Sequence, residues 1–131
     1  MIYILLIFVK REVDKAIGRL GVVRFNSGYY AYVGSAELNF EHRIKRHLSK
    51  KKKLFWHIDY LLNGKGVEIK KVFYLDGVFE HETAKKMLMF GFKVIKGFGS
   101  SDCNCPGHLF YIDDEKKFKS LIEKIGFKQC V

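Results

Sequence analysis

Residues 2–9 form a run of branched and aromatic side chains that is apolar at both odd and even positions. A strand with one face in water alternates polar and apolar residues, whereas a strand covered on both faces does not. The run therefore predicts a strand inside a sheet. Its odd-numbered residues, Tyr3 to Val9, should line one face and its even-numbered residues, Ile2 to Phe8, the other.

The rest of the chain alternates between segments with strand-like and helix-like patterns. Residues 10–14 are polar and predict a turn. The further strands are predicted at 15–20 with 22–25 (one glycine-interrupted strand or a hairpin), 29–34, 67–75, 94–98 and 109–112. In the strand at 29–34, Tyr30 and Tyr32 should face one side and Tyr29, Ala31 and Val33 the other. The helices are predicted at 39–49, 55–62 and 80–90, with a last one capped by Asp113 or Asp114 and closed by Gly126.

The first helix has an apolar stripe made by Phe40, Ile44 and Leu48, which are spaced by four residues. Arg43 and His47 lie at the border of this stripe, so they should face the seam between the helix and the sheet. In the second helix, the residues predicted to face the core are Phe55, Ile58 and Leu62. In the third, they are Ala84, Met87 and Leu88, and in the last, Phe118, Leu121, Ile122 and Ile125.

The length and the order of elements predict one α+β domain over residues 1–131, with a small, central, mainly antiparallel sheet flanked by helices. The composition, 48% hydrophobic and 29% charged, is globular and excludes a disordered chain. No apolar run reaches the roughly 20 residues of a membrane-spanning helix, so we expect no membrane contact. The three cysteines are too few for a secreted disulfide framework, which predicts a reducing cytoplasm.

The chain carries 24 Lys and Arg against 14 Asp and Glu, a net charge of +10. Such a surplus favours a polyanionic partner, because cations that face phosphates release counterions. Nucleic acid is the partner expected. The residues predicted to contact it are Arg46 and the lysine run Lys50, Lys51, Lys52 and Lys53. The run has a second interpretation that remains open, a solvated cap that complements the helix dipole.

Residues 32–47 contain several side chains that could take part in catalysis. Here Tyr32-Val33-Gly34-Ser35 precedes a predicted helix that bears Arg43 and His47. This order resembles the GIY-YIG nuclease superfamily, in which a Tyr-Ile-Gly motif is followed by a helix with an essential arginine. The first half of the signature is not Gly28-Tyr29-Tyr30, because no chain reverses between two strands in a single residue. Met1-Ile2-Tyr3 matches it better, although the leading glycine is missing and the span from Tyr3 to Tyr32 exceeds the usual hairpin.

A wider resemblance covers nearly the whole chain. It rests on the opening strand and on Ile17-Gly-Arg-Leu-Gly, Gly28-Tyr-Tyr-Ala-Tyr-Val-Gly-Ser-Ala, Trp56-His-Ile-Asp-Tyr-Leu and the glycine- and cysteine-rich segment 97–110. In this order they resemble a family of small prokaryotic proteins of unknown activity that are regarded as divergent GIY-YIG members. The resemblance implies a GIY-YIG-like fold.

The resemblance also implies a metal-dependent endonuclease that acts on DNA in preference to RNA, with repair as one expected role. Tyr3 and Tyr32 would position and activate water, Arg43 would stabilise the phosphorane charge, and His47 would complete the catalytic edge. A glutamate would hold Mg²⁺ or Mn²⁺. This glutamate is either Glu80 or Glu82, and the helical register with Ala84 and Met87 favours Glu80. The alternative is a nucleic-acid-binding module that keeps the fold without the chemistry.

A second cluster is Cys103-x-Cys105-Pro-x-His108, with His57, Asp102 or Cys130 as further candidates. Structural zinc usually takes four ligands with cysteines at least two residues apart, so the spacing fits Zn²⁺ less well than small buried thiols. A thiol nucleophile paired with His108 or His57 is a third interpretation. The sequence alone leaves all three open.

Overall fold

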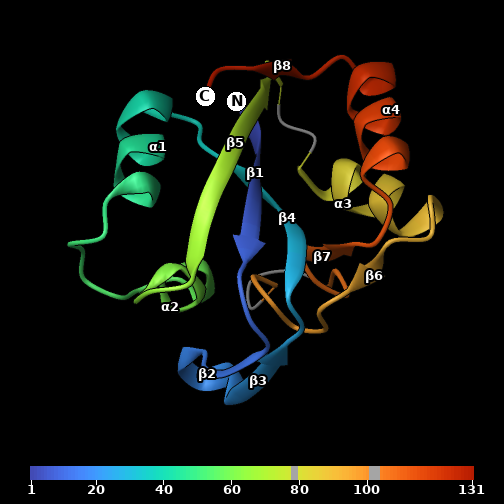
Figure 1. Cartoon of the computed structure of the whole chain (residues 1–131). Helices are drawn as coiled ribbons and strands as arrows, with labels where there is room; N and C mark the ends of the chain where they lie inside the picture. The colour runs from blue at the N-terminus through green and yellow to red at the C-terminus, as the bar shows by residue number, and fades with distance from the viewer. Residues whose placement is uncertain (78–79, 101–103) are drawn as a thin grey trace.

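The computed structural model describes residues 1–77, 80–100 and 104–131. Within these residues the main sheet has six strands in the order β6-β7-β4-β1-β5-β8, and every neighbouring pair is antiparallel (Figure 1). The predicted α+β class with a mainly antiparallel central sheet is confirmed. Across the sheet the strands are β6 (Lys93–Val94), β7 (Leu109–Ile112), β4 (Gly28–Ser35), β1 (Ile2–Val9), β5 (Val67–Leu75) and β8 (Lys128–Gln129).

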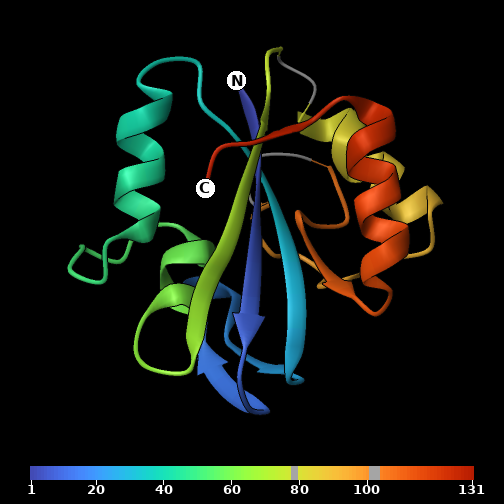
Figure 2. The same ribbon diagram turned by 45° about the horizontal axis from the view of Figure 1, so that its top comes forward.

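Helices cover both faces of the sheet, so the molecule has three layers. Helices α1 (Phe40–Leu48) and α2 (His57–Leu62) lie on one face, and α3 (Glu80–Met89) and α4 (Glu115–Ile125) on the other (Figure 2). A small hairpin lies at the end of the sheet where β1 finishes. It consists of β2 (Val13–Ala16), the 3₁₀ turn η1 (Gly18–Leu20) and β3 (Val22–Phe25). Among the described residues, no helix has the length and apolarity to span a membrane.

Strand β1 lies at the centre, hydrogen-bonded to β4 on one side and β5 on the other. Its odd-numbered residues belong to a first core shared with α1 and α2, while Ile2, Ile4 and Leu6 belong to a second core shared with α3 and α4. The predicted division of β1 between two faces is therefore confirmed. The prediction for β4 is also confirmed, because Tyr30 and Tyr32 enter the first core and Ala31 and Val33 the second.

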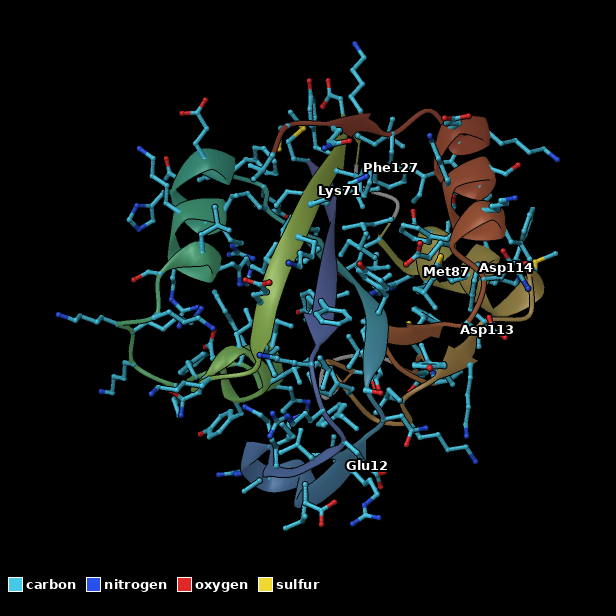
Figure 3. The ribbon with its side chains drawn as sticks, viewed as in Figure 1. Glu12, Lys71, Met87, Asp113, Asp114 and Phe127 are labelled. Carbon is cyan, nitrogen blue, oxygen red and sulfur yellow. The ribbon has the colours of Figure 1, made fainter. Side chains whose placement is uncertain are left out.

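The helices contribute to the two cores through the predicted faces, with two exceptions, Leu48 and Phe55. Met87 lies on the sheet side of α3 and is fully buried in the second core (Figure 3). The N-cap of α4 is Asp114, not Asp113, since its side chain accepts a hydrogen bond of 3.0 Å from the Lys117 amide.

The two exceptions were predicted to be buried and are exposed. Leu48 is 42% exposed because it is the last residue of α1, and the chain turns away in an extended conformation at Ser49. Phe55 is 75% exposed because α2 begins only at His57, so helical periodicity does not fix the direction of its side chain. Both errors come from extending a helical pattern beyond the residues that are helical.

Several predicted strand boundaries are also wrong. The turn predicted at 10–14 ends earlier, since β2 already begins at Val13 and stops at Ala16. The strand predicted at 94–98 is limited to β6, and the following residues turn back, with Phe98 N bonded to Ile95 O at 3.1 Å. Strand β8 was missed because its two residues, Lys128 and Gln129, are polar and exposed and therefore carry no apolar pattern.

A close approach of Tyr3 to Gly34 fixes how β1 and β4 fit together. The two residues are register partners, and a Cβ atom at Gly34 would lie 2.6 Å from Cζ of the Tyr3 ring. Only a residue without a side chain can sit beneath the ring. The glycine of the Tyr-Val-Gly motif thus allows Tyr3 to lie across the end of β4.

Replacing this glycine should destabilise the protein through the Tyr3 ring. Gly34→Ala is expected to lower the free energy of unfolding by about 1–3 kcal/mol, the usual cost of overpacking a core. In a Tyr3→Ala background the ring is gone, so the same substitution should be neutral or stabilising. Urea unfolding of the four proteins measures this coupling, and an equal cost in both backgrounds would refute the steric explanation.

Candidate active site

The predicted catalytic residues meet at the end of the two central strands where β1 starts and β4 ends, at the top of Figure 1. Antiparallel pairing brings Tyr3 to the end of β4, and the short connection after Ser35 places α1 over this end of the sheet. Arg43 and His47 lie on α1, and Glu80 begins α3 from the other face. The site therefore draws on four elements that are far apart in sequence.

The two tyrosines form the buried side of the site. The Tyr3 hydroxyl hydrogen-bonds Nε2 of His47 at 2.8 Å, and Tyr3 is 2% exposed. Burial raises the pKa of both Tyr3 and Tyr32, an effect that nearby Glu80 and Asp59 reinforce and the Arg43 cation opposes. Both phenols are therefore protonated at neutral pH, and Tyr32 can donate a hydrogen bond to an oxygen atom of a bound molecule, while the Tyr3 hydroxyl is shared with His47.

His47 is a neutral imidazole enclosed by aromatic rings. It is 2% exposed and packs against Tyr3, Tyr32 and Trp56. Burial lowers its pKa to about 4, with a further lowering by Lys52. Its Nδ1 atom has no hydrogen-bond partner among the residues that the structure describes. A ring in this state orients Tyr3 and is too weakly basic to be protonated at neutral pH.

Arg43 is held at the site by backbone and aromatic contacts. Its Nη1 donates a hydrogen bond of 2.7 Å to the Ser35 carbonyl, and its guanidinium carbon lies 4.8 Å from the centre of the Trp56 ring. Within the described parts of the chain no carboxylate lies within ion-pair distance of Arg43, so it is not committed to Glu41 or another acid there. An arginine anchored in this way has further N–H groups to offer a phosphate.

Glu80 is the glutamate that reaches this site. It is half-buried, and the Ser35 side chain lies close enough to affect its pKa. Burial raises its pKa, while His81, Ser35 and Arg43 lower it in that order, and the net shift is upward. Glu82 is exposed. Both glutamates line a hollow of about 370 Å³ whose walls are Met1, Ser35, Ala36, Glu37, Gly77, Glu80, His81 and Glu82.

Arg46 was predicted to contact nucleic acid, but the structure commits its guanidinium to Asp59. Nη1 and Nη2 each donate a 2.8 Å hydrogen bond to the two carboxylate oxygens of Asp59, which is fully buried. The same carboxylate accepts from the amides of Phe55 and Trp56 at 2.9 and 2.8 Å. Burial raises the pKa of Asp59, and these hydrogen bonds outweigh it and leave the pKa below its usual range. The ion pair joins α1 to the start of α2.

The lysine run divides into two pairs. Lys50 Nζ donates to the carbonyls of Leu62, Gly64 and Val67 at 3.0, 3.3 and 2.7 Å. Lys52 Nζ caps the end of α1 through the carbonyls of Arg46 and His47 at 3.1 and 2.8 Å, and burial lowers its pKa to about 8. Lys52 follows the helix-cap interpretation, whereas Lys50 instead ties the end of α1 to the segment that joins α2 and β5. Lys51 and Lys53 have exposed side chains and remain candidates for contact with phosphate.

The second predicted cluster is assembled only in part. Cys105 and His108 lie together, and His81 of α3 completes a group whose ligand atoms are all within 4.8 Å of one another. His57 is not a member of this group, and its Nδ1 accepts a 2.9 Å hydrogen bond from the Gly99 amide. Cys103 and Asp102 fall outside the described residues. Cys130 is exposed and does not join the group.

Sequence reasoning missed two residues of these sites, Asp59 and His81. Asp59 had a local signal, because it follows Trp56 by three residues at the start of a helix, the position from which a carboxylate caps backbone amides. His81 had none, since only the packing of α3 brings it to a loop more than 20 residues away.

A family model described as a domain of unknown function, DUF123, matches residues 2–129. No curated protein and no solved structure matches the chain. The match covers all the elements that build the site.

The buried state of His47 should make stability depend on pH. Its folded pKa of about 4 lies below the ordinary value of 6.5, so between these values the unfolded chain binds more protons. Stability is present in full above about pH 6.5 and should fall by about 3 kcal/mol as the pH drops to about 4. Urea unfolding across this range measures the loss.

His47→Gln removes the titrating group and can still hydrogen-bond Tyr3, so its stability should vary much less with pH. The matched control is His42→Gln, which changes an exposed histidine of the same helix and should keep the wild-type profile. A pH profile that is the same for His47→Gln and the wild type would show that another group is responsible.

Proposed function

This chain belongs to the DUF123 family, and we propose that it is a cytoplasmic, metal-dependent endonuclease of GIY-YIG type that hydrolyses phosphodiester bonds in DNA. The observation that carries the proposal is that Tyr3, Tyr32, Arg43 and Glu80 lie together where β1 starts and β4 ends. These are the residue types that the resemblance implies for phosphodiester hydrolysis, and they come from four separate elements. The sequence resemblance to the superfamily and the net charge of +10 support it.

Arg43 would stabilise the charge that develops on the phosphate. Attack of water on a phosphodiester concentrates negative charge on the non-bridging oxygens, and a planar guanidinium can bind two of them at once. The bond to the Ser35 carbonyl and the Trp56 ring fix the guanidinium before the substrate arrives. Preorganised donors of this kind do not need to reorient during the reaction.

The hollow beside Arg43 is lined by oxygen-bearing groups of the kind that hard divalent cations prefer. The side chains of Glu37, Glu80, Glu82 and Ser35 lie on its wall, and the carboxylates would have to move closer together to bind Mg²⁺ or Mn²⁺. Without a cation, three carboxylates would also repel a phosphate. Glu80 is the residue expected to hold the ion, with Glu82 at the rim, and a bound ion supplies a water of lowered pKa.

The tyrosines would act through their O–H groups. Because burial keeps both phenols protonated, Tyr3 and Tyr32 can orient a water molecule or a phosphate oxygen, and the proton of the attacking water is not passed to a phenolate. His47 holds the Tyr3 hydroxyl in place through the 2.8 Å hydrogen bond. Tyr3 and Tyr32 thus serve in positioning.

The same raised pKa values favour one alternative, a nucleic-acid-binding module that has kept the fold and lost the chemistry. The glycine missing before Tyr3 points the same way. The two functions differ in one readout, because both require salt-dependent binding and only the first requires metal-dependent cleavage of the bound strand.

Cleavage of branched, nicked and duplex DNA in Mg²⁺ or Mn²⁺ tests the nuclease. Arg43→Ala should reduce the cleavage rate by at least about 100-fold, as removal of a preorganised donor does. Arg11→Ala removes an exposed arginine outside the site and should have no effect. Glu80→Gln should abolish the metal-dependent rate while Glu82→Gln retains most of it. Cleavage that survives both Arg43→Ala and Tyr32→Phe would refute the site, and binding without cleavage in the wild type would establish the alternative.

Lys51 and Lys53 should contribute more to DNA binding than two exposed lysines elsewhere on the surface. Lys51→Ala combined with Lys53→Ala is expected to reduce the slope of log K against log salt concentration by about 2. The control, Lys116→Ala with Lys119→Ala, removes the same charge from exposed positions on α4 and should leave the slope nearly unchanged. Fluorescence anisotropy with a labelled duplex, without divalent metal, measures both slopes. Equal slopes for the two double variants would exclude a specific contact by residues 51 and 53.

A further inference from the structure

A second group of metal-ligand side chains lies next to Glu80 and is not used by the proposed hydrolysis. His81 follows Glu80 on α3, and its imidazole ring centre is 5.7 Å from that of His108. Cys105 precedes His108 in the loop before β7. The ligand atoms of the three residues lie within 4.8 Å of one another.

The loop that carries two of these residues is held firmly. The His108 amide donates to the Phe98 carbonyl at 2.8 Å, and its carbonyl accepts from the Val33 amide at 2.9 Å, which ties it to β4. A Cβ atom at Gly107 would lie 2.6 Å from the Ile95 carbonyl oxygen, so the loop passes this backbone too closely for any side chain. His108 is therefore a fixed, buried ligand, whereas His81 is exposed and can adjust.

The chemistry of this set differs from that of the hollow at Glu80. Two imidazoles and a thiolate suit Zn²⁺ and Co²⁺, whereas Mg²⁺ requires oxygen ligands. Burial and the nearby His81 both lower the pKa of His108, which favours the neutral ring that binds metals. Tetrahedral zinc places its ligand atoms roughly 3.5 Å apart, so the observed spread of at most 4.8 Å needs a closure of only about 1 Å.

A metal ion can reach two of the three side chains, those of His81 and Cys105, directly from solvent. His81 and Cys105 lie on the wall of an open hollow of about 670 Å³, whose other lining residues are Ala84, Lys85, Leu88, Asn104 and Pro106. Three protein ligands are also the number that zinc sites with an open coordination position use.

We propose that His81, Cys105 and His108 form a binding site for a zinc-class transition metal, adjacent to the oxygen-lined hollow at Glu80, whose wall His81 also lines. On binding, the Cys105 thiol releases its proton to solvent and the thiolate, His81 and His108 coordinate the ion. The ion links the first turn of α3 to the loop before β7, two elements that are distant in sequence.

The test uses the full chain, reduced and stripped with a chelator, and then titrated with Co²⁺ and Zn²⁺. The wild type should take up about one Zn²⁺ per chain by elemental analysis and should show a thiolate-to-Co²⁺ charge-transfer band that Zn²⁺ abolishes. An excess of Mg²⁺ should not displace the band. Zinc content far below one per chain, or a Co²⁺ spectrum without thiolate character, would overturn the proposal.

Variants identify the ligands. Cys105→Ser should remove the charge-transfer band, and His81→Ala should weaken binding by more than the roughly 10- to 100-fold that outer-shell changes cost. Because His81 is exposed, its replacement should not disturb folding, so this variant remains informative if Cys105→Ser is unstable. The controls are Cys130→Ser and His42→Ala, both at exposed positions, which should bind as the wild type does. Full affinity in His81→Ala would place the metal elsewhere and refute the site.

Discussion

The site depends on the fit of the Tyr3 ring over Gly34. This contact fixes the register of β1 on β4, and a slip by one residue would exchange the two faces of β1 between the two cores. With the register fixed, the Tyr3 hydroxyl emerges beneath α1 and bonds His47, and the end of β4 presents Ser35 to both Arg43 and Glu80. The absence of one side chain at Gly34 thus positions groups contributed by β1, β4, α1 and α3.

The positive charge of the chain is divided between internal contacts and the surface. Arg46 neutralises the buried carboxylate of Asp59, and Lys50 and Lys52 bind backbone carbonyls where α1 ends and α2 is followed by β5. These cations hold α1 against α2, and the guanidinium carbons of Arg43 and Arg46 both lie over the Trp56 ring, 4.8 and 4.4 Å from its centre. The net charge of +10 therefore overstates the basic surface available to a polyanion. Part of it is internal architecture that keeps Arg43 in place.

Sequence patterns predicted the features that depend on local periodicity. The two faces of β1 and β4, the buried stripe of α3 and the N-cap region of α4 follow from residues close to one another in the chain. The predictions that failed concerned the ends of helices or residues that are far apart in the sequence. Leu48 and Phe55 lie at helix boundaries, where no further turn fixes the side chain. His81 and Cys105 meet only because α3 packs beside the loop before β7. The pairing of Tyr3 with Tyr32 was predicted from a family resemblance and from the fact that two strands cannot be joined by a single residue.

The central place of β1 has a consequence for how the protein is made. The strand leaves the ribosome before its partners β4 and β5, which end at Ser35 and Leu75. At about 5–20 residues per second, the ladder on its second side cannot close until roughly 3–13 s after β1 has been synthesised. During that interval an eight-residue segment, apolar on both faces, has an unpaired edge that other chains can extend. This domain should therefore depend on chaperones while β5 is still being synthesised, and strong overexpression should favour aggregation over folding.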